Sequence, residues 1–387
     1  MDKTYLLTPG PTPVPPETLL EMARPVIHHR ENEFRTLLGQ CREGLRYLFQ
    51  TRRDVLVLAS SGTGAMEAAV TNFLRRGDKA LYVNGGKFGE RWGKILTAYG
   101  CQGVEVPVAW GQAVDPEEVR RALDADPGIR AVYVQATETS TAVRHPVGAL
   151  AAITRERADV LLVVDGITAV GVFDLPMDAL GIDVLLTASQ KALMLPPGLA
   201  FIAWSEKAEG FLEAADLPRF YFDLATEREK QADNQTAWTP AVTLIVGLRD
   251  VLGRIREETL AGVFRRTAKL AGATRAGVLA LGLRLFAPDH PSDACTAACM
   301  PDGIDGREVM KILRERFGVI VAGGQDQAQG KILRIAHMGT VDDIQVITAI
   351  TTLEYALRKV GHPARLGSGV RAVLEFLGAS SARFIVE

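Results

Sequence analysis

The chain is poor in cysteine, in aromatic residues and in uncompensated charge. It has 4 cysteines and 6% aromatic residues in 387 positions, and its formal net charge is −2 at pH 7. Cysteines this sparse and scattered do not build the disulfide framework of a secreted domain, so a reducing compartment fits. The balanced charge gives no reason to expect nucleic acid or an anionic membrane as a partner. The composition therefore favours small-molecule chemistry.

Long apolar runs and targeting segments are absent as well. No stretch reaches the roughly 18 apolar residues of a membrane-spanning helix. The first residues, MDKTYLLTPGPTPVPPE, contain no cationic segment leading into an apolar one, and the final FIVE is neither a peroxisomal nor a retention signal. We therefore expect a cytoplasmic protein. Its 47% hydrophobic content over 387 residues is enough for a large core and two domains.

Strands and helices alternate from residue 55 to residue 204 and predict a mostly parallel sheet covered on both faces. Apolar runs predict strands at 55–59, 80–83, 104–108, 131–135, 184–186 and 199–204. Helical spacing predicts helices at 32–49, 65–76, 88–99 and 116–123, and from about 240. From about residue 259 the pattern is mixed, with strands at 294–300 and 331–336 and helices at 306–317 and 341–358, the last one capped by Thr340.

The stretch DVLLTASQKALMLPPGLAF, residues 183–201, places a lysine after a buried strand. Lys191 thus lies at the carboxyl edge of the sheet, where ligands of open α/β folds bind. A lysine that is partly desolvated there, or lies beside another cation, becomes a nucleophile. Asp165 ends a second apolar strand, ADVLLVVD. The alternatives are a solvated loop lysine, and for the acid a helix cap, a metal ligand or the partner of a protonated pyridine nitrogen.

The stretch VLVLASSGTGAMEAAVTNFLRRGD joins a strand, a glycine turn and a helix. The backbone N–H groups of Gly62, Thr63 and Gly64 would face an anion, helped by the helix dipole and the Thr63 hydroxyl. Glycines also serve turns that have no ligand. The turn lacks the G-x-G-x-x-G spacing of a dinucleotide site, and Ser60 and Ser61 lack the G-x-S-x-G pattern of a nucleophile elbow. An anion cradle, and specifically a phosphate site, is the prediction.

At these residues the sequence resembles the class V aminotransferases of the fold-type-I pyridoxal 5'-phosphate (PLP) enzymes, nearest the alanine–glyoxylate and serine–pyruvate aminotransferase group. In that family SQK followed by PPG surrounds the lysine that holds PLP as a Schiff base. The resemblance covers most of the chain and implies an α/β fold with a mostly parallel seven-stranded sheet, its single antiparallel strand at 199–204, and a smaller α+β domain. It implies an N-terminal arm at 1–17, a large PLP-binding domain at 18–258 and a small C-terminal domain at 259–387.

The resemblance assigns roles to individual cofactor contacts. Lys191 would hold PLP, Gln190 beside it would contact the cofactor, and Asp165 would keep the ring nitrogen protonated. Phe88 stands at the stacking position of the family's NG-x-aromatic-G motif, where many relatives carry tryptophan. Thr139, in ATETSTAVRHP, would meet the phenolic oxygen or the phosphate. Core packing for Phe88 and a local backbone hydrogen bond for Thr139 are the alternatives.

The resemblance also implies substrate contacts and a second subunit. Gly10, in the TPGP segment of the arm, would lie near the substrate, and Arg334 in KILRIAHMG would hold its α-carboxylate by two parallel bonds. The T-x-x-T-P stretch would bring Thr236 and Thr239 to the phosphate site of the partner subunit in a homodimer. A purely structural arm, a salt bridge of Arg334, and a helix at Pro240 capped by Thr239 are the alternatives.

The implied reaction moves an amino group from a small amino acid, serine or alanine, to a small 2-oxo acid, glyoxylate or pyruvate. No second arginine can be assigned to a side-chain carboxylate, although Arg30 and Arg144 stay open. A cysteine desulfurase-like PLP lyase is one alternative, but it needs a mobile-loop cysteine and usually carries histidine in place of Gln190. A non-catalytic binding or scaffold subunit is the alternative from another class.

A metal site is the less favoured interpretation of the cysteine and histidine pairs. Cys295 and Cys299 lie near His290 in the sequence, but free cysteines behave as small hydrophobes and these two fall in a predicted strand. His28 and His29 are adjacent and point in different directions on any regular element. We expect polar surface for the histidines and no metal.

Overall fold

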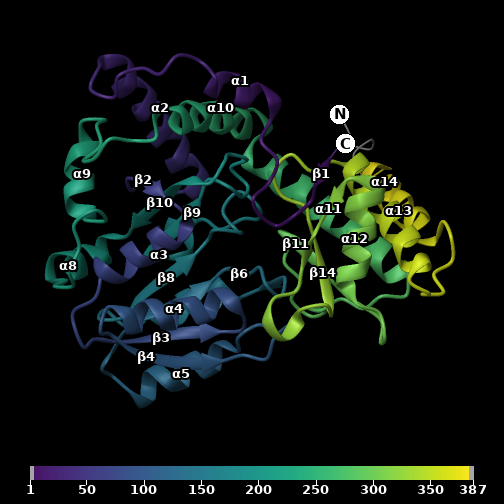
Figure 1. Cartoon of the computed structure of the whole chain (residues 1–387). Coiled ribbons are helices and arrows are strands. Elements are labelled where there is room, and N and C mark those ends of the chain that lie inside the picture. Colours follow the sequence, from purple (N-terminus) through teal and green to yellow (C-terminus); the bar gives the residue numbers. More distant parts are fainter. Residues whose placement is uncertain (1–3, 383–387) are drawn as a thin grey trace.

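The larger part of the molecule is built on one seven-stranded sheet. The computed structural model describes residues 4–382, and Figure 1 shows this sheet beside a smaller unit formed by the C-terminal part of the chain. The order is β2 (Leu56–Ser60), β10 (Gly198–Trp204), β9 (Val184–Ala188), β8 (Leu161–Asp165), β5 (Ile129–Gln135), β3 (Lys79–Asn84) and β4 (Gln102–Pro107). The pairs from β9 to β4 are parallel, and β10 is antiparallel to both of its neighbours. The predicted sheet and its antiparallel strand are confirmed.

Both faces of this sheet are buried because successive residues of a strand point to opposite sides. In β5, Val132 and Val134 belong to one apolar core, and Ala131 and Tyr133 belong to the other. The first face is covered by α2 (Asn32–Phe49), α5 (Pro116–Ala125), α6 (Val147–Arg155), α7 (Met177–Leu180) and α10 (Val242–Glu258). The second face is covered by α3 (Gly62–Thr71), α4 (Lys87–Ala98) and α8 (Glu206–Ala214).

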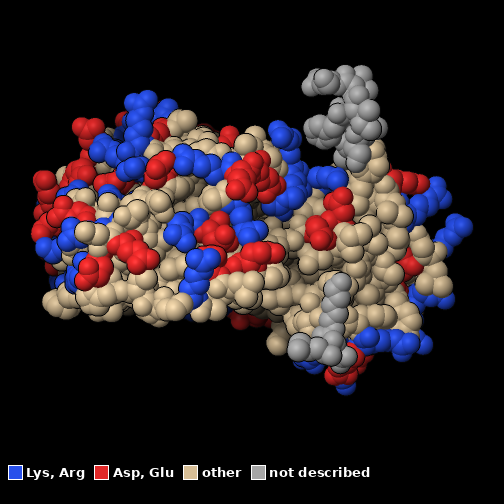
Figure 2. All heavy atoms as spheres, turned by 90° about the horizontal axis from the view of Figure 1, so that it is seen from above, with Lys and Arg blue, Asp and Glu red and all other residues tan. Residues whose placement is uncertain are grey.

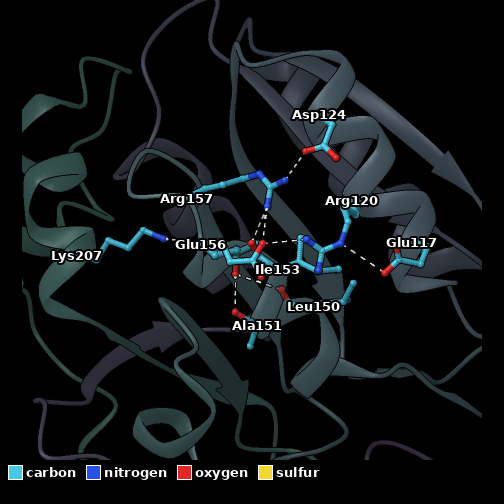
Figure 3. Close-up of polar contacts among 10 residues, drawn as sticks. Glu117, Arg120, Asp124, Leu150, Ala151, Ile153, Glu156, Arg157 and Lys207 are labelled. Carbon is cyan, nitrogen blue, oxygen red and sulfur yellow. Dashed lines mark hydrogen bonds and ion pairs between the residues drawn. The ribbon is translucent and has the colours of Figure 1, made fainter.

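Ion pairs join α5 and α6 on the outer surface, as Figure 3 shows. Arg120 of α5 contacts Glu117 of its own helix and Glu156 at the end of α6, the latter at 2.9 Å. Arg157 contacts Asp124 of α5. Exposed pairs of this kind contribute about 0–1 kcal/mol each. They orient the two helices, while the apolar core supplies most of the stability.

The surface carries both signs of charge. Acidic and basic side chains are interspersed on the face seen in Figure 2, which agrees with the formal net charge of −2. Within residues 4–382, no helix combines the length and the apolar character that crossing a membrane requires.

The C-terminal part of the chain forms a second sheet with its own apolar core. Strands β11 (Cys295–Cys299), β14 (Ile332–Ala336) and β13 (Ala322–Gly323) lie in this order and pair antiparallel. The helices of this part are α11 (Leu260–Ala280), α12 (Gly306–Phe317), α13 (Asp343–Lys359) and α14 (Ser368–Ala382), with a short 3-10 turn at Asp326–Ala328. These elements correspond to the predicted smaller α+β unit, and its boundary at residue 259 stays a prediction.

The N-terminal arm runs from the second sheet toward the first. Its strand β1 (Tyr5–Leu6) pairs in parallel with β12 (Val319–Ile320). The amide nitrogen of Ala336 then donates a hydrogen bond to the carbonyl oxygen of Leu7, at 2.9 Å. The prolines that follow lead into α1 (Pro16–Met22), which packs on α10. The arm therefore ties the two sheets together.

One helix ends earlier than the sequence predicts. The helix expected at 65–76 and stopped by Gly77 is α3, which begins inside the glycine turn and ends at Thr71. The buried side chain of Asn72 ends it, because its amide donates to the carbonyl oxygens of Ala68, at 2.9 Å, and Phe222, at 2.7 Å. This contact with a distant loop is invisible in the local pattern.

Two expected helix caps are wrong. Thr340 does not cap α13, because Asp342 and Gln345 form a reciprocal capping box two residues later. The helix expected from Pro240 begins at Val242 with Ala241 at its cap position, so Thr239 caps nothing. The residues before α10 instead form a loop that is held by contacts with distant side chains.

At the edge of the large sheet, one side chain makes the backbone hydrogen bonds that a neighbouring strand would make. Gln231 of α9 (Leu224–Ala232) accepts a hydrogen bond from the amide of Val57 at 3.1 Å and donates to the carbonyl oxygen of Val57 at 2.8 Å. Glu227, one turn earlier, accepts hydrogen bonds from the Gln231 amide at 2.8 Å and from the backbone of Ala237 at 3.1 Å. Edge strand β2 is thereby covered and tied to the loop before α10.

We expect Gln231→Leu to lower the free energy of unfolding by about 2–4 kcal/mol, because it leaves both backbone groups of Val57 buried without partners. The measurement is the urea midpoint of the purified protein. Gln112→Leu, at an exposed position, is the control and should change the free energy by no more than about 0.5 kcal/mol. Equal midpoints for Gln231→Leu and wild type would contradict this role of the side chain.

Candidate active site

The carboxyl ends of β8 and β9 bring an acid and an amine to one edge of the sheet. Asp165 is the last residue of β8, and Lys191 follows β9 by three residues. Asp165 is buried and accepts a hydrogen bond from the amide of Ile167 at 2.8 Å. Burial raises the pKa of the Asp165 carboxyl to about 7, and the nearby charge of Lys191 opposes this shift. The charge of each group therefore affects the pKa of the other, in agreement with their expected positions at neighbouring strand ends.

The N-terminal arm closes over Lys191. The amine donates a hydrogen bond to the carbonyl oxygen of Pro9 at 2.5 Å, and a Cβ atom added at Gly10 would lie 2.1 Å from the Lys191 nitrogen. Gly10 has φ of +134°, so both its conformation and the space around it require glycine. Thr12 donates to the carbonyl oxygens of Gln190 and Lys191, at 3.2 and 2.7 Å. The structure thus places Gly10 directly beside the amine.

The pKa of the Lys191 amine is lowered from 10.5 to about 8, mainly by burial. The positive charges of Arg334 and Arg91 contribute to this lowering, while Cys295 and Asp165 oppose it. A lysine in this state is partly neutral near pH 8 and can act as a nucleophile or a base.

The glycine turn has the geometry of an anion cradle. It forms the first residues of α3, and Ser61 at the cap position makes no side-chain cap bond. An added Cβ atom would lie 2.4 Å from the Ile167 side chain at Gly62 and 1.9 Å from the Ser60 hydroxyl at Gly64. The Gly64 amide donates to the Ser61 carbonyl oxygen at 3.0 Å, so it does not face an anion as predicted, whereas the N–H groups of Gly62 and Thr63 lie in the first turn and have no intrahelical partner.

Phe88 opens α4 and is fixed by a buried carboxylate. Glu138 accepts hydrogen bonds from the amides of Phe88 and Gly89, at 3.2 and 3.0 Å, and from the side-chain amide of Gln135 at 2.9 Å. Ser140 donates to it through its amide at 3.2 Å and through its hydroxyl. Burial raises the pKa of Glu138, and these hydrogen bonds oppose that shift. The carboxylate links the start of α4 to the short strand β6 (Thr137–Glu138), which pairs with β7 (Val143–Arg144).

Arg334 reaches from β14 of the second sheet to the loop after β6. Its Nη1 donates to the carbonyl oxygen of Thr139 at 2.7 Å, and its Nε and Nη2 donate to the carbonyl oxygen of Gly323 at 3.1 and 2.8 Å. These bonds use three of the five guanidinium N–H groups and leave one on each terminal nitrogen. That remaining pair can hold a carboxylate by two parallel bonds. The side chain of Thr139 itself bonds to the Thr168 hydroxyl at 2.5 Å.

Two predicted residues lie away from this cluster. Thr236 and Thr239 line a separate hollow together with Tyr221 and Trp238. Thr236 is buried and its hydroxyl donates to the carbonyl oxygen of Trp238 at 2.6 Å, whereas Thr239 is exposed. No contact within the described chain joins either threonine to Lys191. A role for them at a phosphate site would need a second subunit.

The cysteine and histidine pairs show no built metal site. Cys295 and Cys299 are free and lie in strand β11, as predicted. Residues 4–382 contain no group of three or more His, Cys, Asp or Glu side chains placed to hold a metal ion. The rings of His28 and His29 contact each other at a tilt of 41°, with centroids 4.9 Å apart.

Two charged residues of the site were missed by the sequence interpretation. Glu138, which precedes Thr139 in ATETSTAVRHP, was assigned no role, and Arg91 of α4 was not considered. Arg91 Nη1 donates to the Thr63 hydroxyl at 3.0 Å. Its place one helical turn after Phe88 was the available signal, because residues three apart share a helix face.

A family model described as "Aminotransferase class-V" matches residues 4–342. The chain belongs to this family. It is 41% identical to the soluble hydrogenase 42 kDa subunit of Anabaena cylindrica (96% of this chain, 98% of the relative). It is 36% identical to the L-aspartate–glyoxylate aminotransferase of Paracoccus denitrificans (97% of each chain) and 34% identical to the serine–glyoxylate aminotransferase of Methylorubrum extorquens (97% and 96%). The ureidoglycine–glyoxylate aminotransferase structure from Bacillus subtilis superposes with a TM-score of 0.92 at 29% identity (98% and 99%).

This class V aminotransferase is a PLP-dependent transaminase. The residues present fit the cofactor. Within residues 4–382, the buried side-chain oxygen of Gln190, next to Lys191, has no hydrogen-bond partner. The first turn of α3 has N–H groups at Gly62 and Thr63 without intrahelical partners, and Asp165 supplies a buried carboxyl for a ring nitrogen. An orphaned buried polar atom costs about 1–3 kcal/mol, so a bound ligand that satisfies it stabilises the site.

We expect the rate at which the cofactor-free protein captures PLP to rise with pH through a midpoint near 8, because only the neutral amine of Lys191 reacts. The measurement is the growth of visible absorbance after mixing with PLP at a series of pH values. The same reaction with a small alkylamine corrects for the titration of PLP itself. A midpoint near the ordinary value of 10.5 would show that the amine is not desolvated.

Proposed function

We propose that this aminotransferase moves the amino group of a small amino acid, serine or alanine, to a small 2-oxo acid, glyoxylate or pyruvate. The observation that carries the proposal is the pairing of the Lys191 amine with Arg334. The guanidinium of Arg334 is close enough to lower the pKa of Lys191, and it keeps two N–H groups for a carboxylate. An α-carboxylate held there places the substrate amino group and Cα beside the amine.

The proposed donor has no second carboxylate. This preference depends on Arg30 and Arg144, the two arginines that the sequence left open as ligands of a side-chain carboxylate. Arg30 donates to the side chain of Gln235 at 3.0 Å and to the backbone of Thr236 at 3.1 Å. The guanidinium of Arg144 lies over the ring of Phe173, 3.9 Å from its centroid. Both are used in other contacts, so neither favours aspartate. The serine donor named for the Methylorubrum relative fits better than the aspartate donor named for the Paracoccus relative.

In this proposal each side chain has one task. Bound PLP supplies an electron-withdrawing ring for the bond that breaks at Cα. Lys191 would hold the cofactor covalently, and its free neutral amine would accept and return the Cα proton of the substrate. Asp165 keeps a proton on the ring nitrogen by its negative charge, and Phe88 packs on the ring face. Gly62, Thr63, Gly64, Gln190 and Thr139 contact the cofactor, while Gly10 and Arg334 contact the substrate.

We also propose that the enzyme is a homodimer whose phosphate sites are completed across the interface by Thr236 and Thr239. The loop that carries them is flanked by exposed aromatic residues. Phe220 is 76% exposed and packs on Trp238, with centroids 4.8 Å apart, and Tyr221 stacks on the same ring. Large exposed aromatic side chains typically mark protein interfaces.

Two alternatives are less well supported. A cysteine desulfurase needs a cysteine on a mobile loop, and Cys295 and Cys299 belong to strand β11. The hydrogenase subunit name of the Anabaena relative suggests a non-catalytic companion. A companion would not need Lys191, Asp165 and Arg334 in one electrostatic cluster. The four free cysteines suit the reducing cytoplasm, which is the compartment that we propose.

We expect Lys191→Ala to abolish the visible absorbance of the bound cofactor and to lower turnover by at least about 1,000-fold, because both the covalent link and the base are lost. The measurement is the spectrum of the purified enzyme and its change on addition of serine, alanine or aspartate. Lys94→Ala, an exposed lysine of α4, is the control. Wild-type protein that binds no PLP would favour the companion role, and release of sulfide from cysteine would favour the lyase.

We expect activity to return when inactive Lys191→Ala subunits are mixed with inactive Thr236→Val/Thr239→Val subunits. In a mixed dimer one site carries both defects, and the other combines an intact Lys191 with intact threonines from its neighbour. The measurement is activity after the two variants are unfolded and refolded together, with each variant refolded alone as the control. The proposed shared site is wrong if the mixture stays as inactive as its components.

A further inference from the structure

Arg91 is a cation at the site with no role so far. Its Nη1 donates to the hydroxyl of Thr63 at 3.0 Å, and its guanidinium lies over the ring of Phe88, 5.0 Å from the centroid. Within residues 4–382 no carboxylate lies at ion-pair distance from it, although other cations of the same helix, such as Lys87 and Lys94, have acidic partners. The counter-charge of Arg91 is therefore missing from the described chain.

The hydrogen bond from Arg91 decides where the Thr63 proton points. A hydroxyl group has one proton to donate and two lone pairs that accept. Arg91 is a donor only, so it occupies a lone pair of Thr63 and leaves the proton free. Thr63 lies in the first turn of α3, where its own N–H group and that of Gly62 have no intrahelical partner. The proton is thus available to an anion in the cradle.

The Phe88 ring restrains the guanidinium from the other side. A cation over an aromatic face is held by the ring quadrupole. Phe88 is in turn fixed by the hydrogen bond from its amide to Glu138, at 3.2 Å. Arg91 therefore has a defined position between the ring and the cradle. Its positive charge also reaches Lys191 and Asp165, whose pKa values it lowers.

We propose that Arg91 is a positioning residue for the cofactor phosphate: it orients the Thr63 hydroxyl toward the phosphate and adds positive charge at the start of α3. The inference rests on the proposed function and deepens it. Arg91 acts through Thr63 and does not touch the reacting atoms. Its effect must therefore depend on the phosphate group and not on the pyridine ring.

The test compares PLP with pyridoxal, which has the same ring and aldehyde but lacks the phosphate. Dissociation constants are measured by the visible absorbance of the purified enzyme after removal and return of each compound. We expect Arg91→Gln and Thr63→Val each to weaken PLP binding roughly tenfold or more and to change pyridoxal binding by less than about twofold. In the double variant, Arg91→Gln should weaken PLP binding by a smaller factor than it does in the wild type, because the Thr63 hydroxyl that Arg91 contacts is already gone.

Two controls separate this role from a general effect of charge or folding. Lys94→Gln removes a cation from the same helix, at a side chain 68% exposed, and should leave PLP binding unchanged. Arg91→Lys keeps the positive charge without the planar guanidinium group, and it should weaken PLP binding less than Arg91→Gln does. Equal weakening of PLP and pyridoxal by Arg91→Gln, or no weakening of either, would overturn the proposal. Wild-type protein that binds neither compound would instead refute the proposed function.

Discussion

The partly desolvated amine of Lys191 is the constraint on which the rest of the site depends. Its lowered pKa comes first from burial, and the burial is supplied by the arm at Pro9 and Gly10. The arm itself is held by its parallel pairing with β12 and by the hydrogen bond from the Ala336 amide of β14, in the second sheet, to the Leu7 carbonyl oxygen. The reactivity of a lysine at the end of β9 therefore depends on a contact made elsewhere in the chain. Any movement of the second sheet relative to the first would change the environment of the amine.

Glu138 connects the two sides of the site in the same way. It fixes the start of α4, which carries Phe88 and Arg91, and it begins the loop whose Thr139 carbonyl oxygen receives Arg334. Gly86 makes this possible, because an added Cβ atom there would lie 2.5 Å from the Glu138 carboxyl carbon. One buried carboxylate thus connects the start of α4, with Phe88 and Arg91, to the loop whose Thr139 carbonyl oxygen accepts from Arg334.

The sequence was sufficient for the features that depend on local pattern. Lys191 and Asp165 could be located because apolar runs reveal strands, and because the carboxyl ends of neighbouring parallel strands share an edge. Arg334 was located by the resemblance of KILRIAHMG to the family. The end of α3 at Thr71 could not be predicted, since Asn72 is held by Phe222, about 150 positions later. The contacts of Arg91 and Glu138 could not be predicted either, because their partners lie 28 and 49–50 residues away. Helical spacing indicates only that Arg91 shares a helix face with Phe88.

The charges of the site are complementary to one kind of ligand. Asp165 and Glu138 are buried carboxyl groups, each with a raised pKa, and the negative charge of Glu138 helps to raise the pKa of Asp165. A cation at Asp165 would restore its ordinary ionisation, as a protonated ring nitrogen does. At the other end, Arg91 and the α3 N-terminus present positive charge without a carboxylate. A molecule that is cationic at one end of a flat ring and dianionic at the other satisfies both ends at once, and PLP is such a molecule.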